Sequence, residues 1–280
     1  MVTRKFLPGS EWLYLKIYSG VKTADIILQE SIIPFVNFLL KEERLIIKWF
    51  FIRYNDPEPH LRIRFQLANN SNYKIVLEKV NHHLNHFIDS GEISNIIIDS
   101  YIRELERYGE NTIEFSEELF CKSSELVLQF LDYNDEEKIF VSMFYIDKLL
   151  YNLKLSNTEK WEWIRKFNNS YKIEFNADKN LNSQLDIKFR KFKPDYINFV
   201  KSDEYKEIRN LITLNIEKSG VSIENIGSIP LLSDFFQSIF HMHINRMFVS
   251  NQRLFEMIIY DHMNRYCKTL LYHNLQYKVI

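Results

Sequence analysis

Residues 57–65, Pro-Glu-Pro-His-Leu-Arg-Ile-Arg-Phe, carry the pattern that decides the fold of this chain. In a β-strand, side chains alternate between two faces. The apolar face of this stretch has Leu61, Ile63 and Phe65, and the polar face has His60, Arg62 and Arg64. Two guanidinium groups two residues apart repel each other and are costly to desolvate, so we expect an anionic partner, and a carboxylate fits the planar fork of arginine. The alternative is an exposed edge strand whose basic face meets water or internal Glu side chains. The stretch by itself favours the two interpretations equally.

The sequence around this stretch predicts further strands. Lys48–Tyr54 is rich in strand formers, and Asn55–Pro59 has the composition of a turn, so the two predict a hairpin with a loop of about five residues. Trp12–Tyr18 alternates in the same way, and Ile93–Ile98 is a third apolar stretch of strand length.

Helical spacing of apolar residues dominates elsewhere. Thr23–Glu42 predicts a helix that is kinked or split at Pro34, and Tyr73–Ile88 predicts an amphipathic helix. Further helices are predicted at Glu117–Leu131, Asp135–Leu153, Thr158–Asn169, Lys201–Lys218 and Asn251–His273. The polar segment Asn176–Pro194 predicts a loop, either over a cleft or as a plain connection. The expected fold class is α+β, with a mostly antiparallel sheet near the N-terminus covered by helices and a helical C-terminal half. Residues 1–280 are expected to form one domain.

Composition restricts the classes of function. The 280 residues are 46% hydrophobic and 26% charged, which is typical of a folded chain with a full core. The net charge of −1 argues against direct nucleic-acid binding through a global field. The two cysteines, Cys121 and Cys267, fit a reducing compartment. Met1–Ser10 lacks the apolar core of a signal peptide, and we expect no membrane span, so the expected location is cytoplasmic.

Three histidines, His82, His83 and His86, lie on the helix predicted at Tyr73–Ile88. His82 and His86 are four residues apart and could bind zinc. No acidic or cysteine third ligand follows at a familiar spacing. A solvated helix face is the favoured interpretation, and no metal is expected.

Pro230–Val249 is the second informative stretch. One helical face has the apolar residues Leu231, Phe235, Ile239 and Met242, and another has Asp234, Ser238, His241 and Asn245. In such a line Asp234 or Ser238 could orient His241 and tune it for proton transfer. The alternative is a polar helix face with a hydrogen-bonded histidine, and a single histidine on a helix is more often structural than catalytic.

Charges alternate in the segment Arg103-Glu-Leu-Glu-Arg-Tyr-Gly109. Taken alone, this pattern is more typical of a salt-bridged surface turn than of a functional site.

Four segments together point to a family: Phe6–Tyr18, Pro59–Phe65, Arg103–Gly109 and His241–Arg246. In this order and at these separations, they resemble the C-terminal elimination domain of class I lantibiotic dehydratases, which also occurs as a separate protein in thiopeptide biosynthesis. Each motif alone is weak, whereas the ordered set spans nearly the whole chain.

The resemblance implies a lyase reaction. A tRNA-dependent glutamylation subunit transfers glutamate to Ser or Thr of a ribosomal precursor peptide, and the elimination domain removes the Cα proton and expels glutamate, leaving dehydroalanine or dehydrobutyrine. The implied partners are the glutamylated precursor peptide, a separate glutamylation subunit and a cyclase, and no cofactor is implied. The chain is too short to hold the glutamylation half, so we expect either a split enzyme or an excised domain.

The resemblance also implies roles for individual residues. Arg62 and Arg64 match strand arginines of the family and would hold the glutamyl carboxylates or stabilise charge on the ester or enolate oxygen. Arg103 matches the arginine of the third motif and would bind an anion in a similar way. His241 is the implied general base or acid.

A second group of residues is expected to bind the substrate around these four. His60 accompanies the strand arginines. His243 and Arg246 belong to the fourth motif, and His243 is a rival to His241 for the role of base. Glu256 lies on the following helix.

Two other functions stay open. Relatives on the same fold join two dehydroalanines in a formal cycloaddition that makes a pyridine macrocycle, and a third possibility is a non-catalytic scaffold that binds the precursor peptide. The presence of Arg62, Arg64 and Arg103 favours elimination, because a cycloaddition has no glutamate to hold.

Overall fold

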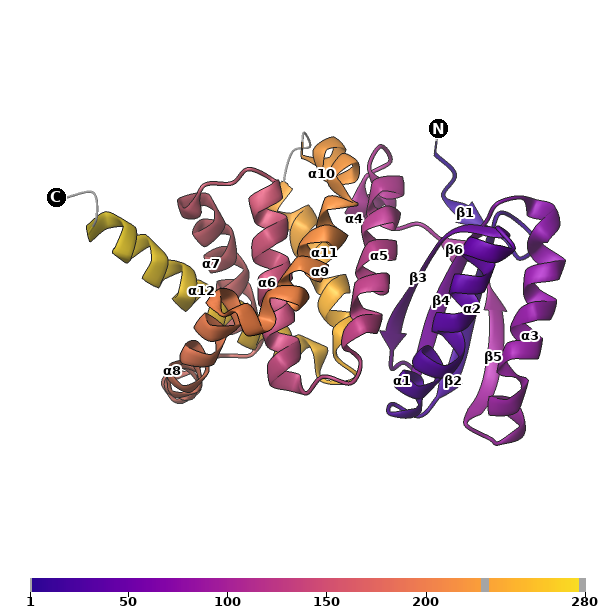
Figure 1. Cartoon of the computed structure of the whole chain (residues 1–280), viewed down its shortest axis with the longest axis horizontal. Helices are drawn as coiled ribbons and strands as arrows, with labels where there is room; N and C mark the ends of the chain where they lie inside the picture. The colour runs from indigo at the N-terminus through magenta and orange to yellow at the C-terminus, as the bar shows by residue number, and fades with distance from the viewer. Residues whose placement is uncertain (1, 228–231, 277–280) are drawn as a thin grey trace. The chain divides into compact units, whose positions relative to one another are not determined.

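The computed structural model describes residues 2–227 and 232–276, with the side chains of 272–276 left out (Figure 1). Contacts within the chain define two compact units. Unit 1 consists of Met1–Asp132 and Asn245–Ser250, and unit 2 consists of Tyr133–Ile244 and Asn251–Ile280. Whether residues 1–280 act as a single elimination domain stays a prediction.

Unit 1 is built on a four-stranded antiparallel sheet with the strand order β3-β4-β2-β5. The strands are β2 (Trp12–Ser19), β3 (Ile46–Tyr54), β4 (His60–Leu67) and β5 (Ile93–Asp99). A second sheet pairs the short strands β1 (Lys5–Phe6) and β6 (Tyr101–Ile102). The predicted strands and the β3–β4 hairpin are confirmed. Because β4 lies between β3 and β2, the interpretation of residues 57–65 as an edge strand is wrong.

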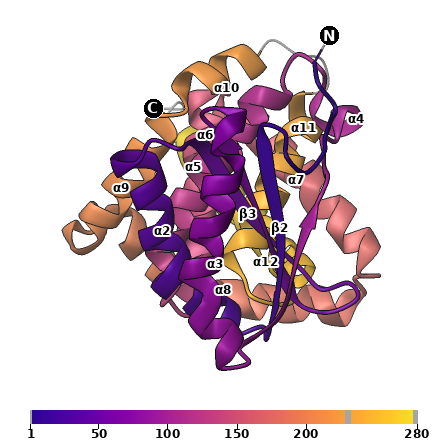
Figure 2. The ribbon, with the colours of Figure 1, turned by 90° about the vertical axis from the view of Figure 1, so that its right-hand side faces the viewer.

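Helices cover the apolar face of this sheet. They are α1 (Thr23–Ile27), α2 (Ile33–Asn37) and α3 (Tyr73–Asp89), and π-helical turns at Leu28–Ile32 and Phe38–Glu42 extend α1 and α2. Figure 2, seen from the β5 side, shows α2 and α3 on the same side of the strands. Phe35 of α2 packs edge-on against Phe65 of β4, with 6.0 Å between ring centroids. The face of β4 that carries His60, Arg62 and Arg64 therefore points away from these helices.

The stretch Thr23–Glu42 is long and apolar enough to cross a membrane by length and composition alone, whereas the sequence predicted no membrane span. Phe35, Val36 and Leu39 are buried in the structure, and Phe35 contacts the sheet. Its apolar character is therefore accounted for by packing in the core of unit 1.

Side chains close the outer edge of β3. The Ser124 hydroxyl of α5 (Ile113–Val127) accepts a hydrogen bond from the Phe51 amide at 3.2 Å. The Asn245 side chain pairs with both backbone groups of Arg53, at 2.9 Å each, as a neighbouring strand would. The Arg246 Nε donates to the Phe51 carbonyl at 2.7 Å. These bonds satisfy backbone groups that would otherwise be open to another strand.

Unit 2 is helical, so the predicted helical C-terminal half is confirmed. Its helices are α6 (Asp135–Asn152), α7 (Asn157–Glu174), α8 (Lys179–Lys201), α9 (Lys206–Glu217), α10 (Gly220–Ile226), most of α11 (Leu232–Met247) and α12 (Gln252–Gln276). Capping boxes at Asn134 and Ser156 fix the starts of α6 and α7. The rings of Phe167 and Tyr260 pack α7 against α12 at 5.4 Å.

The loop predicted at Asn176–Pro194 is wrong, because most of it belongs to the 23-residue helix α8. Asp178 caps the start of this helix by accepting a hydrogen bond from the Leu181 amide. Leu185, Phe189, Phe192, Tyr196 and Phe199 form its buried stripe. Pro194 is exposed inside the helix, where burial of this stripe outweighs the loss of one backbone hydrogen bond.

Candidate active site

The first group of candidate residues is the basic face of the sheet in unit 1, defined by His60, Arg62 and Arg64 of β4. The register of the sheet places these side chains beside Tyr18, Lys16 and Tyr14 of β2, respectively. Lys16 forms an ion pair with Asp99 at 2.6 Å. The remaining positive charge of this face comes from the two arginines.

Arg64 is a buried cation inside an aromatic box. Its guanidinium carbon lies 4.3 Å from the ring centroid of Tyr14, 4.9 Å from that of Tyr101 and 5.2 Å from that of Phe50. The residue is 9% exposed, and among the described residues no Asp or Glu pairs with it and its Nε has no hydrogen-bond partner. Aromatic faces offset part of the cost of burying this charge. A bound anion would supply the negative charge and hydrogen-bond acceptors that the Arg64 guanidinium lacks among the described residues.

Arg62 and His60 interact directly on the same face. The Arg62 Nε donates to His60 Nε2 at 3.0 Å, and the guanidinium lies 3.4 Å from the Tyr54 ring centroid. Since Nε2 accepts a proton donor, Nδ1 carries the ring hydrogen and donates to the Glu58 carbonyl at 2.8 Å. In the described residues no carboxylate forms an ion pair with Arg62. His60 therefore orients Arg62 rather than offering a charge of its own.

This arrangement predicts a pH effect on stability. Burial lowers the pKa of His60 in the folded protein, whereas the unfolded chain titrates near the ordinary value of about 6.5. Below that pH the unfolded chain binds the proton more readily, so folding stability is lost as the pH falls toward the folded-state pKa. The free energy of unfolding of the wild type, measured by urea denaturation, should therefore fall by more between about pH 7 and about pH 5 than that of His60→Gln. Parallel curves for the two proteins would contradict this assignment.

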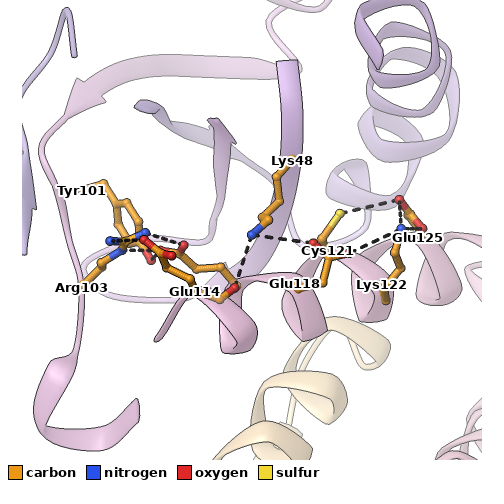
Figure 3. A network of polar contacts seen from close by, with 9 residues as sticks. Lys48, Tyr101, Arg103, Glu114, Glu118, Cys121, Lys122 and Glu125 are labelled. Atoms are coloured by element: carbon orange, nitrogen blue, oxygen red, sulfur yellow. Dashed lines mark hydrogen bonds and ion pairs between the residues drawn. The ribbon is translucent and has the colours of Figure 1, made fainter. Parts of the chain in front are cut away.

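Arg103 binds an anion, but the anion belongs to the chain itself (Figure 3). Its Nε and Nη2 each donate to the Glu117 carboxylate at 2.7 Å, and its Nη1 donates to the Thr3 carbonyl at 3.1 Å. Arg103 is 2% exposed and Glu117 is fully buried. The surface-turn interpretation of this segment holds for the exposed pairs Arg107–Glu104 and Arg4–Glu106, but it is wrong for Arg103.

Glu117 also connects Arg103 to the aromatic box. The Tyr101 hydroxyl donates to Glu117 Oε1 at 2.8 Å, and the Tyr101 ring faces Arg64. Burial, together with the charge of Glu117, raises the pKa of Tyr101, so this hydroxyl stays a proton donor. Arg103 thus acts on the basic face by holding Glu117, which holds Tyr101.

A second group of candidate residues lies in unit 2, around His241. Its Nδ1 lies 2.9 Å from Glu256 Oε2, and Glu256 is fully buried. The Arg253 Nη1 donates to the same oxygen at 3.0 Å, and Arg253 also contacts Tyr171 and Glu174. A carboxylate on Nδ1 fixes the ring orientation and directs Nε2 to proton exchange. His241 keeps 27% of its side chain exposed, so a substrate can reach it.

The residues predicted to orient His241 do not do so. Asp234 binds Lys166 at 2.5 Å, and the Ser238 hydroxyl donates to the Asp234 carbonyl at 3.2 Å. Asn245 instead pairs with Arg53 in unit 1. The orienting carboxylate comes from Glu256 on the next helix. Pro230 and Leu231, which opened the predicted helix, lie outside the described residues.

His243 and Arg246 are fully buried. The His243 ring stacks on Tyr145 with 3.9 Å between centroids, and Arg246 lies over the Phe120 ring and donates to β3. These contacts stabilise the structure and favour His241 over His243 as the residue that meets a substrate.

Among the described residues, no group of three or more His, Cys, Asp or Glu side chains gathers as a metal site. The three histidines of α3 therefore give no support to the zinc interpretation.

Comparison with known proteins identifies the family. Residues 12–267 match the family described as lantibiotic biosynthesis dehydratase C-term. The chain belongs to this family. Two curated relatives of the family are the subtilin biosynthesis protein SpaB of Bacillus subtilis, 24% identical over 90% of this chain, and the nisin biosynthesis protein NisB of Lactococcus lactis subsp. lactis, 28% identical over 94%. The matches cover 25% and 26% of those proteins, so the chain spans about a quarter of their length.

Solved structures share the fold. The tRNA dependent lantibiotic dehydratase MibB from Microbispora sp. 107891 is 18% identical, with a TM-score of 0.67 over 91% of this chain and 28% of that chain. The pyridine synthase TbtD from thiomuracin biosynthesis is 10% identical, with a TM-score of 0.63 over 94% of this chain and 99% of that chain. The resemblance found from the four sequence motifs and the α+β fold class are both confirmed.

Sequence patterns missed the residues that support the site. None of Glu117, Tyr101 and Arg253 belongs to a recognised sequence motif. Glu117 bonds to Tyr101 and Arg103 across 16 and 14 residues of chain, and Arg253 bonds to Glu256 within the same helix. Tyr14 and Phe50 could have been placed beside Arg64 only once the strand register was known.

Proposed function

We propose that this chain is a lyase that eliminates glutamate from glutamylated Ser or Thr residues of a ribosomal precursor peptide. The observation that carries the proposal is the basic face, where Arg62 and Arg64 lie two residues apart with no carboxylate of the described chain paired to either. A glutamyl ester brings a carboxylate, and a planar guanidinium binds a carboxylate through two parallel hydrogen bonds. Membership of the lantibiotic dehydratase family supports the same reaction class.

The reaction needs a base and a stabilised leaving group. The base removes the Cα proton, the electron pair forms the Cα–Cβ double bond, and the Cβ–O bond breaks with release of glutamate. Glutamate transferred from a tRNA is esterified through its α-carboxyl, which has a pKa of about 3.3–3.7 in the free state, so this carboxylate departs more readily than a hydroxyl. We assign Arg62 and Arg64 to the glutamyl group. His241, oriented by Glu256, is assigned to proton transfer.

The proposal extends to partners. The substrate must come from a subunit that glutamylates Ser and Thr, and the MibB relative of similar fold is tRNA-dependent. We propose a separate tRNA-dependent glutamylation subunit and a later-acting cyclase as partners in the cytoplasm, with no direct nucleic-acid contact and no cofactor. The roles given to Arg103, His60 and Arg246 are supporting ones, through the contacts described above.

The test uses a short synthetic peptide with one O-glutamylserine, incubated with the purified chain and followed by mass spectrometry. The expected result is loss of glutamic acid and formation of dehydroalanine. His241→Ala and Glu256→Gln should each slow this loss by about 100-fold, because proton transfer by a positioned side chain contributes on that order. His82→Ala, which changes an exposed histidine of α3, serves as the matched control and should leave the rate unchanged.

Persistence of the glutamyl ester would refute elimination. A peptide with two preformed dehydroalanines would then be offered to the same protein. Cyclisation would assign the chain to pyridine formation, and inertness toward both peptides would leave the role of a peptide-binding scaffold.

A further inference from the structure

The two outer strands of the sheet in unit 1, β3 and β5, differ in whether their outward backbone groups are hydrogen-bonded. At β3, side chains of Ser124, Asn245 and Arg246 occupy backbone groups of the outer edge. At β5, the backbone pairs with β2 on one side. On its other side, no residue of the described chain donates to or accepts from the backbone of residues 93–98. Every second residue of β5 therefore presents an amide and a carbonyl to the outside.

The outer strand is also apolar. β5 reads Ile-Ser-Asn-Ile-Ile-Ile-Asp and has no lysine and no proline. Ile97 and Ile98, which point to opposite faces, are each 38% exposed. Edge strands of natural proteins usually carry lysine, proline or a covering segment, because an open apolar edge pairs with other chains. An edge of this kind suits a bound strand.

The register of the sheet connects this edge to the basic face. One row of side chains across that face runs from Ile97 of β5 through Lys16 to Arg62, and the next runs from Asp99 through Tyr14 to Arg64. A strand added beside β5 would extend both rows. Its side chains on this face would point to the same side of the sheet as the two arginines.

We propose that the outer edge of β5 binds an extended segment of the peptide substrate as an added strand. The identity of the bound peptide as a substrate rests on the proposed function. Neighbouring strands are about 4.8 Å apart, so the added strand lies about 14 Å from β4. The strand is therefore the segment that flanks the modified Ser or Thr, and the glutamylated residue itself lies nearer the arginines.

Charge favours a peptide substrate over a second copy of this chain. A second β5 would bring Asp99 as its acidic group, and that carboxylate already pairs with Lys16 in its own sheet. Arg62 and Arg64 would then still lack an anion. A glutamylated peptide brings its own carboxylates to the basic face.

The test measures binding of the O-glutamylserine peptide and of two backbone N-methylated forms, by fluorescence anisotropy at a pH where no turnover is seen or in the His241→Ala background. One form carries methyl groups on the odd-numbered amides and the other on the even-numbered amides. Strand addition uses the amides of one edge of the peptide, so one form should lose about tenfold or more in affinity while the other binds like the parent. Equal affinity of the two forms would overturn the proposal.

Substitutions in the protein test whether the peptide binds at the edge formed by β5. Ile97→Lys should weaken peptide binding by about tenfold, since a charged side chain on an edge strand disfavours pairing. Ile47→Lys, at a residue of the capped strand β3 that is 60% exposed, is the matched control and should bind the peptide like the wild type. Circular dichroism checks that both variants are folded. Equal effects of the two substitutions would also overturn the proposal.

The outcomes separate this inference from the proposed function. If the two N-methylated forms differ in affinity but no glutamate is released, the proposed lyase function is refuted and peptide binding at the β5 edge is supported. If glutamate is released but the two forms bind equally, the lyase function is supported and peptide binding at the β5 edge is refuted. A concentration-dependent dimer that Ile97→Lys dissociates would show that a second copy occupies the edge, which overturns the proposal.

Discussion

Arg64→Met is expected to lower the rate of glutamate elimination by about 100- to 1000-fold while leaving the protein at least as stable as the wild type. Arg64 is 9% exposed inside a box of Tyr14, Phe50 and Tyr101 and has no paired carboxylate among the described residues. A cation fixed in a dry site is a strong stabiliser of developing negative charge. The same burial is unfavourable for folding, and an apolar side chain of similar length removes that cost.

The two readouts are the single-turnover rate of glutamate release and the melting temperature. Arg64→Lys keeps the charge but loses the planar fork, so it should recover only part of the rate. The control is Arg165→Met, because Arg165 also lies over an aromatic ring, that of Trp161, but is exposed to solvent. A variant Arg64→Met that loses stability and keeps its rate would show that Arg64 is a structural residue.

Glu117→Ala should lower the free energy of unfolding by about 3–5 kcal/mol, because it leaves the buried charge of Arg103 without its carboxylate. The pair is bidentate at 2.7 Å, and neither side chain is more than 2% exposed. Replacing both members with apolar residues, as in Arg103→Met with Glu117→Leu, should restore most of the lost stability. Urea denaturation of the two single variants and the double variant gives the coupling energy.

The double variant also tests the role of Arg103. If Arg103 contacts the glutamyl group, the stable double variant should be as inactive as Arg64→Met. If Arg103 acts by holding Glu117 and Tyr101, the double variant should keep measurable elimination with a weaker affinity for the peptide. Because Arg103 bonds to Glu117 and Glu117 bonds to Tyr101, we expect the double variant to keep measurable elimination. The control is Glu114→Ala, since Glu114 is exposed and 3.5 Å from the Arg103 guanidinium.

The fold was predictable where local pattern and tertiary packing agree. Alternation in Trp12–Tyr18 and in residues 57–65, with turn residues at Asn55–Pro59, predicts the strands and the hairpin. The helix α8 was missed because its five buried aromatic and aliphatic positions are diluted by polar residues, and because Pro194 suggests a break. Burial in the core of unit 2 decides that segment, and burial cannot be read from a short window of sequence.

The candidate site was predictable only in part. The alternation of residues 57–65 places Arg62 and Arg64 on one face, which the structure bears out. The periodicity of α11 suggested Asp234 or Ser238 as the partner of His241, whereas the partner is Glu256, which lies 15 residues away on α12. Local spacing identifies residues on one helix face, but contacts between helices depend on packing that no spacing rule contains.

The side chains of Asn245 and Arg246, which close the outer edge of β3, are synthesised long after the strand itself. Asn245 pairs with Arg53 across 192 residues of chain, so a ribosome must translate those 192 residues after Arg53 before the edge of β3 can be closed. Until then the nascent sheet has two open edges, and each is a site for mispairing with other chains. A gene truncated after unit 2 begins would yield a sheet that can never be capped. The sheet of unit 1 therefore reaches its finished form only after the helices between Arg53 and Asn245 have been made, although its strands are translated before them.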